Sequence, residues 1–197
     1  MNLPNKLTIS RFFITIVFTI LVLGNYTYSA SVAVIVFFIG MVTDYIDGII
    51  ARSRNLKTDF GALMDPLADK VMVCAAFVSF VARGQLGPFG AYFVIIVISR
   101  EFLITGLRIL AGARGQIISA DRLGKHKTAW QMITIIVVLL RSALDEIMGP
   151  SDPEWLDGVL QMFTWGVYVT MAITIALTVY SGFAYMMKNK ELWSKNN

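Results

Sequence analysis

Four aspartates lie at the ends of two apolar segments, with a spacing typical of a metal site. Asp44 and Asp47 close one segment, and Asp65 and Asp69 open the next. Residues three or four apart share a helix face, so each pair would present two carboxylates together. Ionised groups at membrane depth are costly and usually carry function. Carboxylate oxygens suit hard divalent cations, so we predict that all four aspartates bind Mg²⁺ or Mn²⁺.

Each aspartate also has a purely structural interpretation. Asp65 before Pro66 is typical of a helix start, in which the aspartate caps the helix and the proline fills the first turn. Asp47 could form an ion pair with Arg52 at a helix end, and Asp69 could pair with Lys70 at the surface. Asp59 could be only a loop acid. Together these explanations need four coincidences within 26 residues of a chain that holds thirteen acids. We therefore favour one joint site, with a loop around Gly61 bringing the two helix ends together.

The elements that must position these acids are membrane helices. The chain has 197 residues, of which 56% are hydrophobic and only 15% charged. Several apolar runs approach the roughly 20 residues that cross a bilayer as a helix. We predict an all-α integral membrane protein, with residues 1–197 forming a single domain and a bundle of six transmembrane helices. The expected spans are Leu7–Leu23, Ala30–Arg52, Pro66–Ala82, Pro88–Leu110, Thr128–Leu144 and Val159–Met187.

Basic residues gather on one side of this predicted bundle. They flank the first span, fill the second and fourth loops and follow the last span, whereas the fifth loop is acidic. The positive-inside rule then places both termini and the four aspartates at the cytoplasmic side of a multi-pass protein. The first residues lack the order of a cleavable signal peptide, so we expect none. A single cysteine, Cys74, excludes an internal disulfide.

A second group of charges lies downstream and suggests a phosphate site. Arg100 and Arg108 are two turns apart, so on a helix they share a face. Lys125 and Lys127 open the fifth span, where free amides and the helix dipole favour an anion. We predict that an acceptor phosphate binds Arg108 and Lys125 first, with Arg100 and Lys127 behind them.

The downstream charges have alternative explanations too. The two lysines could follow the positive-inside rule alone or touch anionic lipid head groups. Arg100 and Glu101 could pair with neighbouring helices and hold the bundle together. The only histidine, His126, is more typical of a solvated loop than of a ligand.

The aspartate segment resembles the signature of the CDP-alcohol phosphatidyltransferase family. The pattern DxxDGxxAR, eight residues, GxxxDxxxD is matched at every fixed position, from Asp44 to Asp69. The resemblance covers nearly the whole chain, including the six-span layout. It implies transfer of a phosphatidyl group from a CDP-linked lipid to an alcohol, with release of CMP.

The resemblance also implies a role for each motif residue. The first three acids would hold the metal ions, of which we expect two. Asp69 would act as the general base and could also touch a metal. The residues that would line the cytidine diphosphate site are Asp44, Gly48, Ala51, Arg52 and Gly61.

Within the family, the downstream segments resemble the branch that takes sn-glycerol 3-phosphate. These segments are Ser99–Arg108 and Gly124–Thr128. The implied partners are CDP-diacylglycerol, glycerol 3-phosphate, membrane lipid and a second copy of the chain, with no nucleic acid. The implied location is a bacterial cytoplasmic membrane, with the active site facing the cytoplasm. The alternatives are another acceptor, such as inositol phosphate, or a small cation carrier, although a carrier should spread its acids across the bilayer.

Overall fold

The computed structural model consists of six α-helices and, within the residues that it describes, contains no β-strand. It describes residues 3–24, 26–54, 59–113, 115, 122–148 and 153–190, with side chains at 10–24, 26–43, 70–112, 115, 124–148 and 153–190. The predicted all-α class is confirmed. The helices are α1 Leu3–Leu23, α2 Ser29–Arg54, α3 Asp59–Ala82, α4 Gly90–Ala113, α5 Arg122–Ile147 and α6 Glu154–Lys188.

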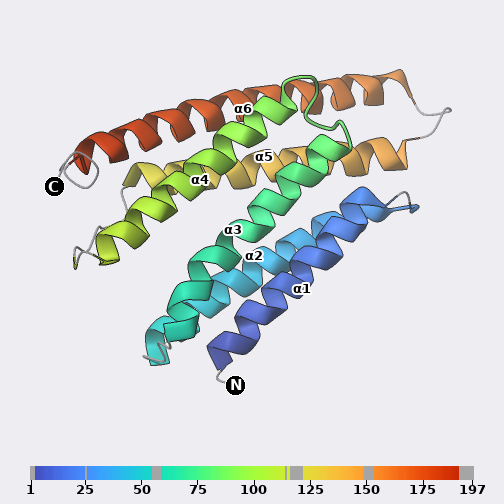
Figure 1. The fold of residues 1–197 in the computed structure, drawn as a ribbon. Helices are drawn as coiled ribbons and strands as arrows, with labels where there is room; N and C mark the ends of the chain where they lie inside the picture. Colours follow the sequence, from blue (N-terminus) through green and yellow to red (C-terminus); the bar gives the residue numbers. More distant parts are fainter. Residues whose placement is uncertain are drawn as a thin grey trace.

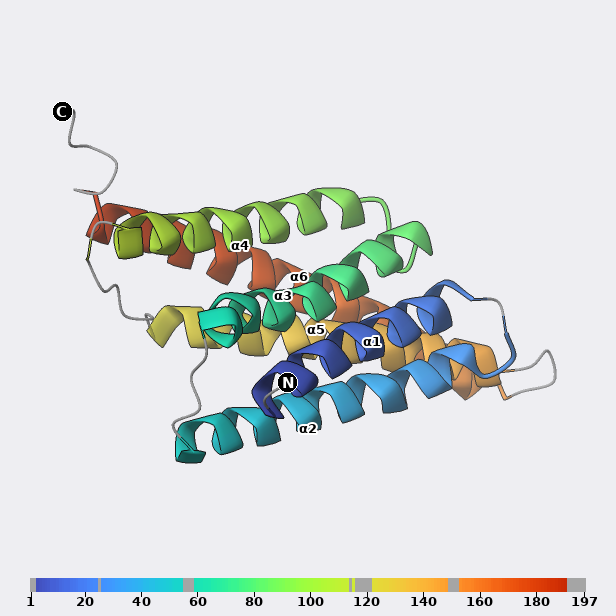
Figure 2. The same ribbon diagram turned by 60° about the horizontal axis from the view of Figure 1, so that its bottom comes forward.

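Successive helices run in alternating directions along one bundle. Figure 1 shows α1, α2 and α3 grouped beside α4, α5 and α6, and α2 packs on α5 where the two groups meet. The start of α1 and the end of α6 therefore lie toward the same end of the molecule, which we call the terminal end (Figures 1 and 2). The end of α2, the start of α3, the end of α4 and the start of α5 also lie toward this end.

Aromatic side chains form the centre of the bundle. Phe18 of α1 packs on Phe37 of α2 with ring centroids 5.8 Å apart. Phe77 of α3 meets Phe93 of α4 edge to face at 4.9 Å, a favourable geometry for two aromatic rings. All four rings are fully buried, so these contacts fix how the helices pair.

Some polar side chains are also buried in this bundle, and many large apolar side chains face outward. Thr134 and Thr174 are completely buried and share a hydrogen bond of 3.1 Å between their hydroxyls. Outside, Phe13, Ile95 and Phe183 are each more than 60% exposed. Water would penalise such a surface, and large exposed apolar areas mark contact with lipid or another protein.

Two of the described helices are long and apolar enough to cross a membrane. They are Gly124–Ile147 and Glu154–Lys188, judged by length and composition. Three shorter apolar helical segments are Ser10–Leu23, Ser29–Thr43 and Lys70–Ala82. The prediction of six crossings therefore remains a prediction.

Glu146 holds the start of α2 at the end opposite the terminal end. The backbone amides of Ala30 and Ser31 donate to its two carboxylate oxygens at 3.3 and 3.1 Å. The first amides of a helix have no partner within the helix, and an acid there also favours the helix dipole. A residue of α5 thus caps α2 and fixes how the two groups of helices meet.

Two predicted helix starts are wrong. α3 begins at Asp59, so Asp65 is not its cap and Gly61 lies in the helix rather than in a loop. Pro66 is therefore the eighth residue of α3, a position that membrane helices tolerate because neighbouring groups can satisfy the freed carbonyl. α5 begins at Arg122, so Lys125 and Lys127 lie within its first turns instead of preceding it.

Candidate active site

The four aspartates of the signature lie in helices at the terminal end. Asp44 and Asp47 are in the last turns of α2, and Asp65 and Asp69 are in the first turns of α3. Figures 1 and 2 place the end of α2 and the start of α3 toward the same end of the bundle. The helical backbone puts the members of each pair on one face.

The side chains of the signature lie outside the described residues. The metal site predicted for the four aspartates therefore stays a prediction. So does the cytidine diphosphate site, which was predicted to include Gly48, Ala51, Arg52 and Gly61. Among the side chains that are described, no group of three or more histidines, cysteines or acids is placed to hold a metal ion.

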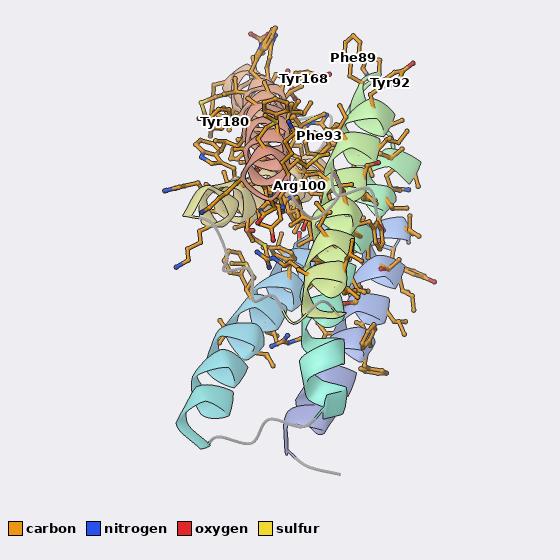
Figure 3. The ribbon with its side chains drawn as sticks, turned by 60° about the vertical axis from the view of Figure 1, so that its left-hand side comes forward. Phe89, Tyr92, Phe93, Arg100, Tyr168 and Tyr180 are labelled. Atoms are coloured by element: carbon orange, nitrogen blue, oxygen red, sulfur yellow. The ribbon has the colours of Figure 1, made fainter. Side chains whose placement is uncertain are left out.

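The two arginines of α4 face α6, as their spacing predicts. The Arg100 Nη2 atom donates to the Ser181 hydroxyl at 3.2 Å, and Figure 3 shows Arg100 along α4. The Arg108 Nε atom donates to the Tyr185 hydroxyl at 3.3 Å, and its guanidinium carbon lies 5.7 Å from the centre of that ring. Because both partners belong to α6, the shared face is confirmed.

Glu101 is the centre of a buried ionic cluster that joins three helices. Lys127 of α5 forms an ion pair with its Oε1 atom, and Arg100 lies 3.6 Å from the same atom. Lys70 of α3 lies 3.7 Å from Oε2. The alternative given above, in which Arg100 and Glu101 hold neighbouring helices together, therefore agrees with these contacts: Glu101 contacts α3 and α5, and Arg100 contacts α6.

The two lysines at the start of α5 differ sharply in environment. Lys125 is exposed, as is His126 beside it. Lys127 is only 2% exposed and faces Glu101. Of this pair, Lys125 is thus the residue whose charge is open to a ligand. The sequence analysis also placed Lys125 before Lys127 as a predicted phosphate ligand.

Sequence reasoning considered Lys70 only as a surface partner of Asp69, and it missed Ser181 and Tyr185. Lys70 follows Asp69 directly, and its ammonium reaches the Glu101 carbonyl oxygen at 3.4 Å and the Thr105 hydroxyl. Charge in an apolar segment was the available signal for Lys70. Nothing in the sequence singled out the two α6 hydroxyls, because they become polar partners only through packing on α4.

An apolar groove of about 450 Å³ lies beside the ionic cluster. It is bordered by α1, α3 and α4, and its surface is almost wholly apolar. Lys70, Glu101, Thr105 and Cys74 are among the residues that line it. The ionic cluster therefore lies next to an apolar groove.

A helical bundle with an apolar exterior and polar contacts between its helices is typical of a membrane protein. The sequence profile of the CDP-alcohol phosphatidyltransferase family matches residues 1–180. The chain therefore belongs to that family.

Curated relatives cover the chain almost end to end. One from Bacillus subtilis, named CDP-diacylglycerol–glycerol-3-phosphate 3-phosphatidyltransferase, is 36% identical over 100% of this chain and 99% of its own length. A relative of the same name from Rickettsia typhi is 30% identical, covering 93% of this chain and 94% of its own. A third, from Mycobacterium tuberculosis, is named probable phosphatidylglycerophosphate synthase and is 30% identical over 95% of this chain.

Proposed function

We propose that this chain transfers the phosphatidyl group of CDP-diacylglycerol to sn-glycerol 3-phosphate, giving phosphatidylglycerol phosphate and CMP. The observation that carries this proposal is the complete aspartate signature, in a chain that is 36% identical over its whole length to a relative named for that reaction. The exposed Arg108 and Lys125 support an acceptor that bears phosphate, because both cationic groups form charge-assisted hydrogen bonds with phosphate oxygens.

The donor site follows from the signature. Arg52 neutralises charge on the pyrophosphate, because a planar guanidinium matches phosphate oxygens. Gly48 and Gly61, which have no side chain, leave room for the nucleotide beside the backbone. Asp44 and Ala51 complete the lining of this site.

The donor set fits divalent cations. Residues three or four apart on a helix share a face, so each aspartate pair would offer two hard oxygen donors together, as Mg²⁺ and Mn²⁺ prefer. Asp44, Asp47 and Asp65 would hold two ions, with Asp69 able to touch the second. When bound, the ions neutralise the pyrophosphate and stabilise charge in the transition state.

The chain's own residues then position the acceptor and move one proton. Arg108 and Lys125 bind its phosphate, with Arg100 and Lys127 behind them. Asp69 accepts the proton of the C1 hydroxyl. That oxygen forms a bond to the lipid-side phosphorus of the donor, the bond from this phosphorus to the CMP oxygen breaks, and CMP leaves. Positioning and charge provide most of the catalysis in such transfers.

The proposed setting is a bacterial cytoplasmic membrane. We place the terminal end, with both termini and the signature, at the cytoplasmic side of six spans, where glycerol 3-phosphate is available and CMP can be released. The working unit is a homodimer, as the family resemblance implies.

Replacement of Asp69 by asparagine tests the base directly. Asparagine keeps the shape of the side chain but cannot accept the proton, so CMP release should fall by a factor of about 100 or more, within the usual range for general base catalysis. The measurement is CMP formed by purified protein with CDP-diacylglycerol, glycerol 3-phosphate and Mg²⁺. The thermal unfolding midpoint of the variant checks that it is folded.

The outcomes separate the proposal from its rivals. Turnover at the level of the unmodified protein would exclude Asp69 as the base. Inositol phosphate that supports faster CMP release than glycerol 3-phosphate would replace the acceptor while keeping the reaction class. No CMP release with any acceptor would favour the cation carrier.

A further inference from the structure

One buried carboxylate, that of Glu101, holds basic side chains from three helices. Glu101 is 8% exposed, and its Oε1 atom receives both Lys127 of α5 and Arg100 of α4. Its Oε2 atom lies 3.7 Å from the ammonium of Lys70 on α3. The carbonyl oxygen of Glu101 also accepts hydrogen bonds from Lys70 at 3.4 Å and from the Thr105 hydroxyl at 2.7 Å.

Such a cluster is a costly way to hold helices together. Buried charges lose their hydration, and an apolar replacement of the same shape is often as stable or more stable. Elsewhere in the bundle, α5 and α6 are joined by the neutral pair Thr134 and Thr174. The ion pairs of Glu101 therefore lie between helices that a neutral contact of this kind could also join.

The bases that this carboxylate holds are neighbours of the proposed reacting groups. Lys70 directly follows Asp69, the proposed base, and Lys127 is two residues from Lys125, a proposed phosphate ligand. The third basic residue, Arg100, lies on the same face of α4 as the other proposed phosphate ligand, Arg108. The carboxylate therefore connects the helix of the base with the two helices of the phosphate ligands.

We infer that Glu101 is a positioning residue for acceptor binding. It fixes Arg100 and Lys127, and through them the facing parts of α4 and α5, in the arrangement that receives a phosphate monoester beside α3. The inference rests on the proposed function. Charges that are held before the ligand arrives need no reorganisation when it binds. A misplacement of ~1 Å in such a site can cost about 100-fold in rate.

The variant that tests this role is Glu101→Gln, which keeps the shape and removes the charge. We expect the apparent KM for glycerol 3-phosphate to rise at least about tenfold, equivalent to ~1.4 kcal/mol. The KM for CDP-diacylglycerol should stay within about twofold, because the donor site lies on α2 and α3. Glu101→Asp, which keeps the charge, should recover part of the acceptor affinity.

A matched control is Glu146→Gln. It removes the charge of another acid that ties two helices together, at the opposite end of the bundle. This variant should lower thermal stability and leave both KM values unchanged. The pair of variants therefore separates an effect on acceptor binding from a general loss of helix packing.

The results that would overturn the inference are specific. If Glu101→Gln lowers kcat or stability and leaves the acceptor KM unchanged, Glu101 is only structural. If the acceptor KM falls, Glu101 merely competes with the acceptor phosphate for Arg100 and Lys127. Should Glu101→Gln fail to fold, Glu101→Asp must still raise the acceptor KM above that of the unmodified protein, because its shorter side chain cannot hold all the basic groups, and an unchanged value would overturn the inference. Absence of CMP release from the unmodified protein would overturn the proposed function, and this inference with it.

Discussion

The Arg108 guanidinium is held in place by an aromatic side chain and, among the described residues, forms no ion pair with an acid. Its guanidinium carbon lies 5.7 Å from the centre of the Tyr185 ring, and its Nε atom donates to the Tyr185 hydroxyl. An aromatic face attracts a cation but carries no net charge of its own. Arg108 is also exposed, so its remaining N–H groups can reach an incoming phosphate. This arrangement contrasts with buried Lys127, whose charge is already paired with Glu101.

Replacing Arg108 by alanine should therefore affect one substrate. We expect the apparent KM for glycerol 3-phosphate to rise about tenfold or more, since a hydrogen-bonded charge pair with the acceptor is lost. The KM for CDP-diacylglycerol should change little. Steady-state CMP release with each substrate varied in turn measures both values.

Arg141→Ala is the control for this experiment. Arg141 donates to the Thr164 hydroxyl at 3.0 Å between α5 and α6, and it borders the polar pocket at the end of the bundle opposite the terminal end. Its loss should leave both KM values unchanged. A similar rise in both KM values for Arg108→Ala would argue against direct contact with the acceptor.

The helix α6 depends on small residues where it packs on α4 and α5. Thr170, Thr174, Thr178 and Gly182 recur every four residues and are buried, as expected for a face that allows close packing in lipid. A Cβ atom added at Gly182 would lie 3.2 Å from the Arg100 Cγ atom. Gly182 therefore provides the space in which Arg100 crosses from α4 to α6.

A leucine at Gly182 should push α6 away from Arg100. Overpacking of this kind typically costs ~1–3 kcal/mol, and it should also weaken acceptor binding because Arg100 is displaced. Thermal unfolding and the acceptor KM measure the two effects. Gly158→Leu on the same helix is the control, because nothing lies within 4 Å of its added Cβ, so stability should be kept. Equal stability of the two variants would contradict the packing argument.

At the scale of the whole molecule, the described surface exposes many large apolar side chains and the apolar core also holds buried hydroxyls, which is unusual for a water-soluble bundle. Hydroxyls of Thr134, Thr174 and Thr178 are completely buried, whereas rings such as Trp165 and Phe183 are over 60% exposed. In lipid, interhelical hydrogen bonds and close packing replace the hydrophobic effect as the force between helices. With the six spans proposed above, the alternating helix directions would place both termini at one side of the bilayer.

Cysteine labelling in intact cells tests this topology. In a Cys74→Ser background, a cysteine at Tyr26, in the connection between α1 and α2, should react with a membrane-impermeant maleimide added outside. A cysteine at Lys190, just after α6, should react only after the membrane is permeabilised. Labelling of both sites in intact cells would contradict a cytoplasmic terminal end.

Much of this protein could be predicted from local spacing. The all-α class, the shared face of Arg100 and Arg108 and the family all follow from periodicity and motif, which need only neighbours in the chain. Helix starts were harder. The cap predicted at Asp65 was wrong because α3 begins at Asp59 and continues through Pro66.

The partners of buried charges depended on contacts between distant segments. Lys70, Glu101 and Lys127 are far apart in sequence, and only the packing of α3, α4 and α5 brings them to one carboxylate. The same holds for Glu146, which caps a helix more than 100 residues away. Spacing along a helix defines a face, but which face meets which is decided by how all the side chains fill the space between helices, and this depends on the whole chain at once.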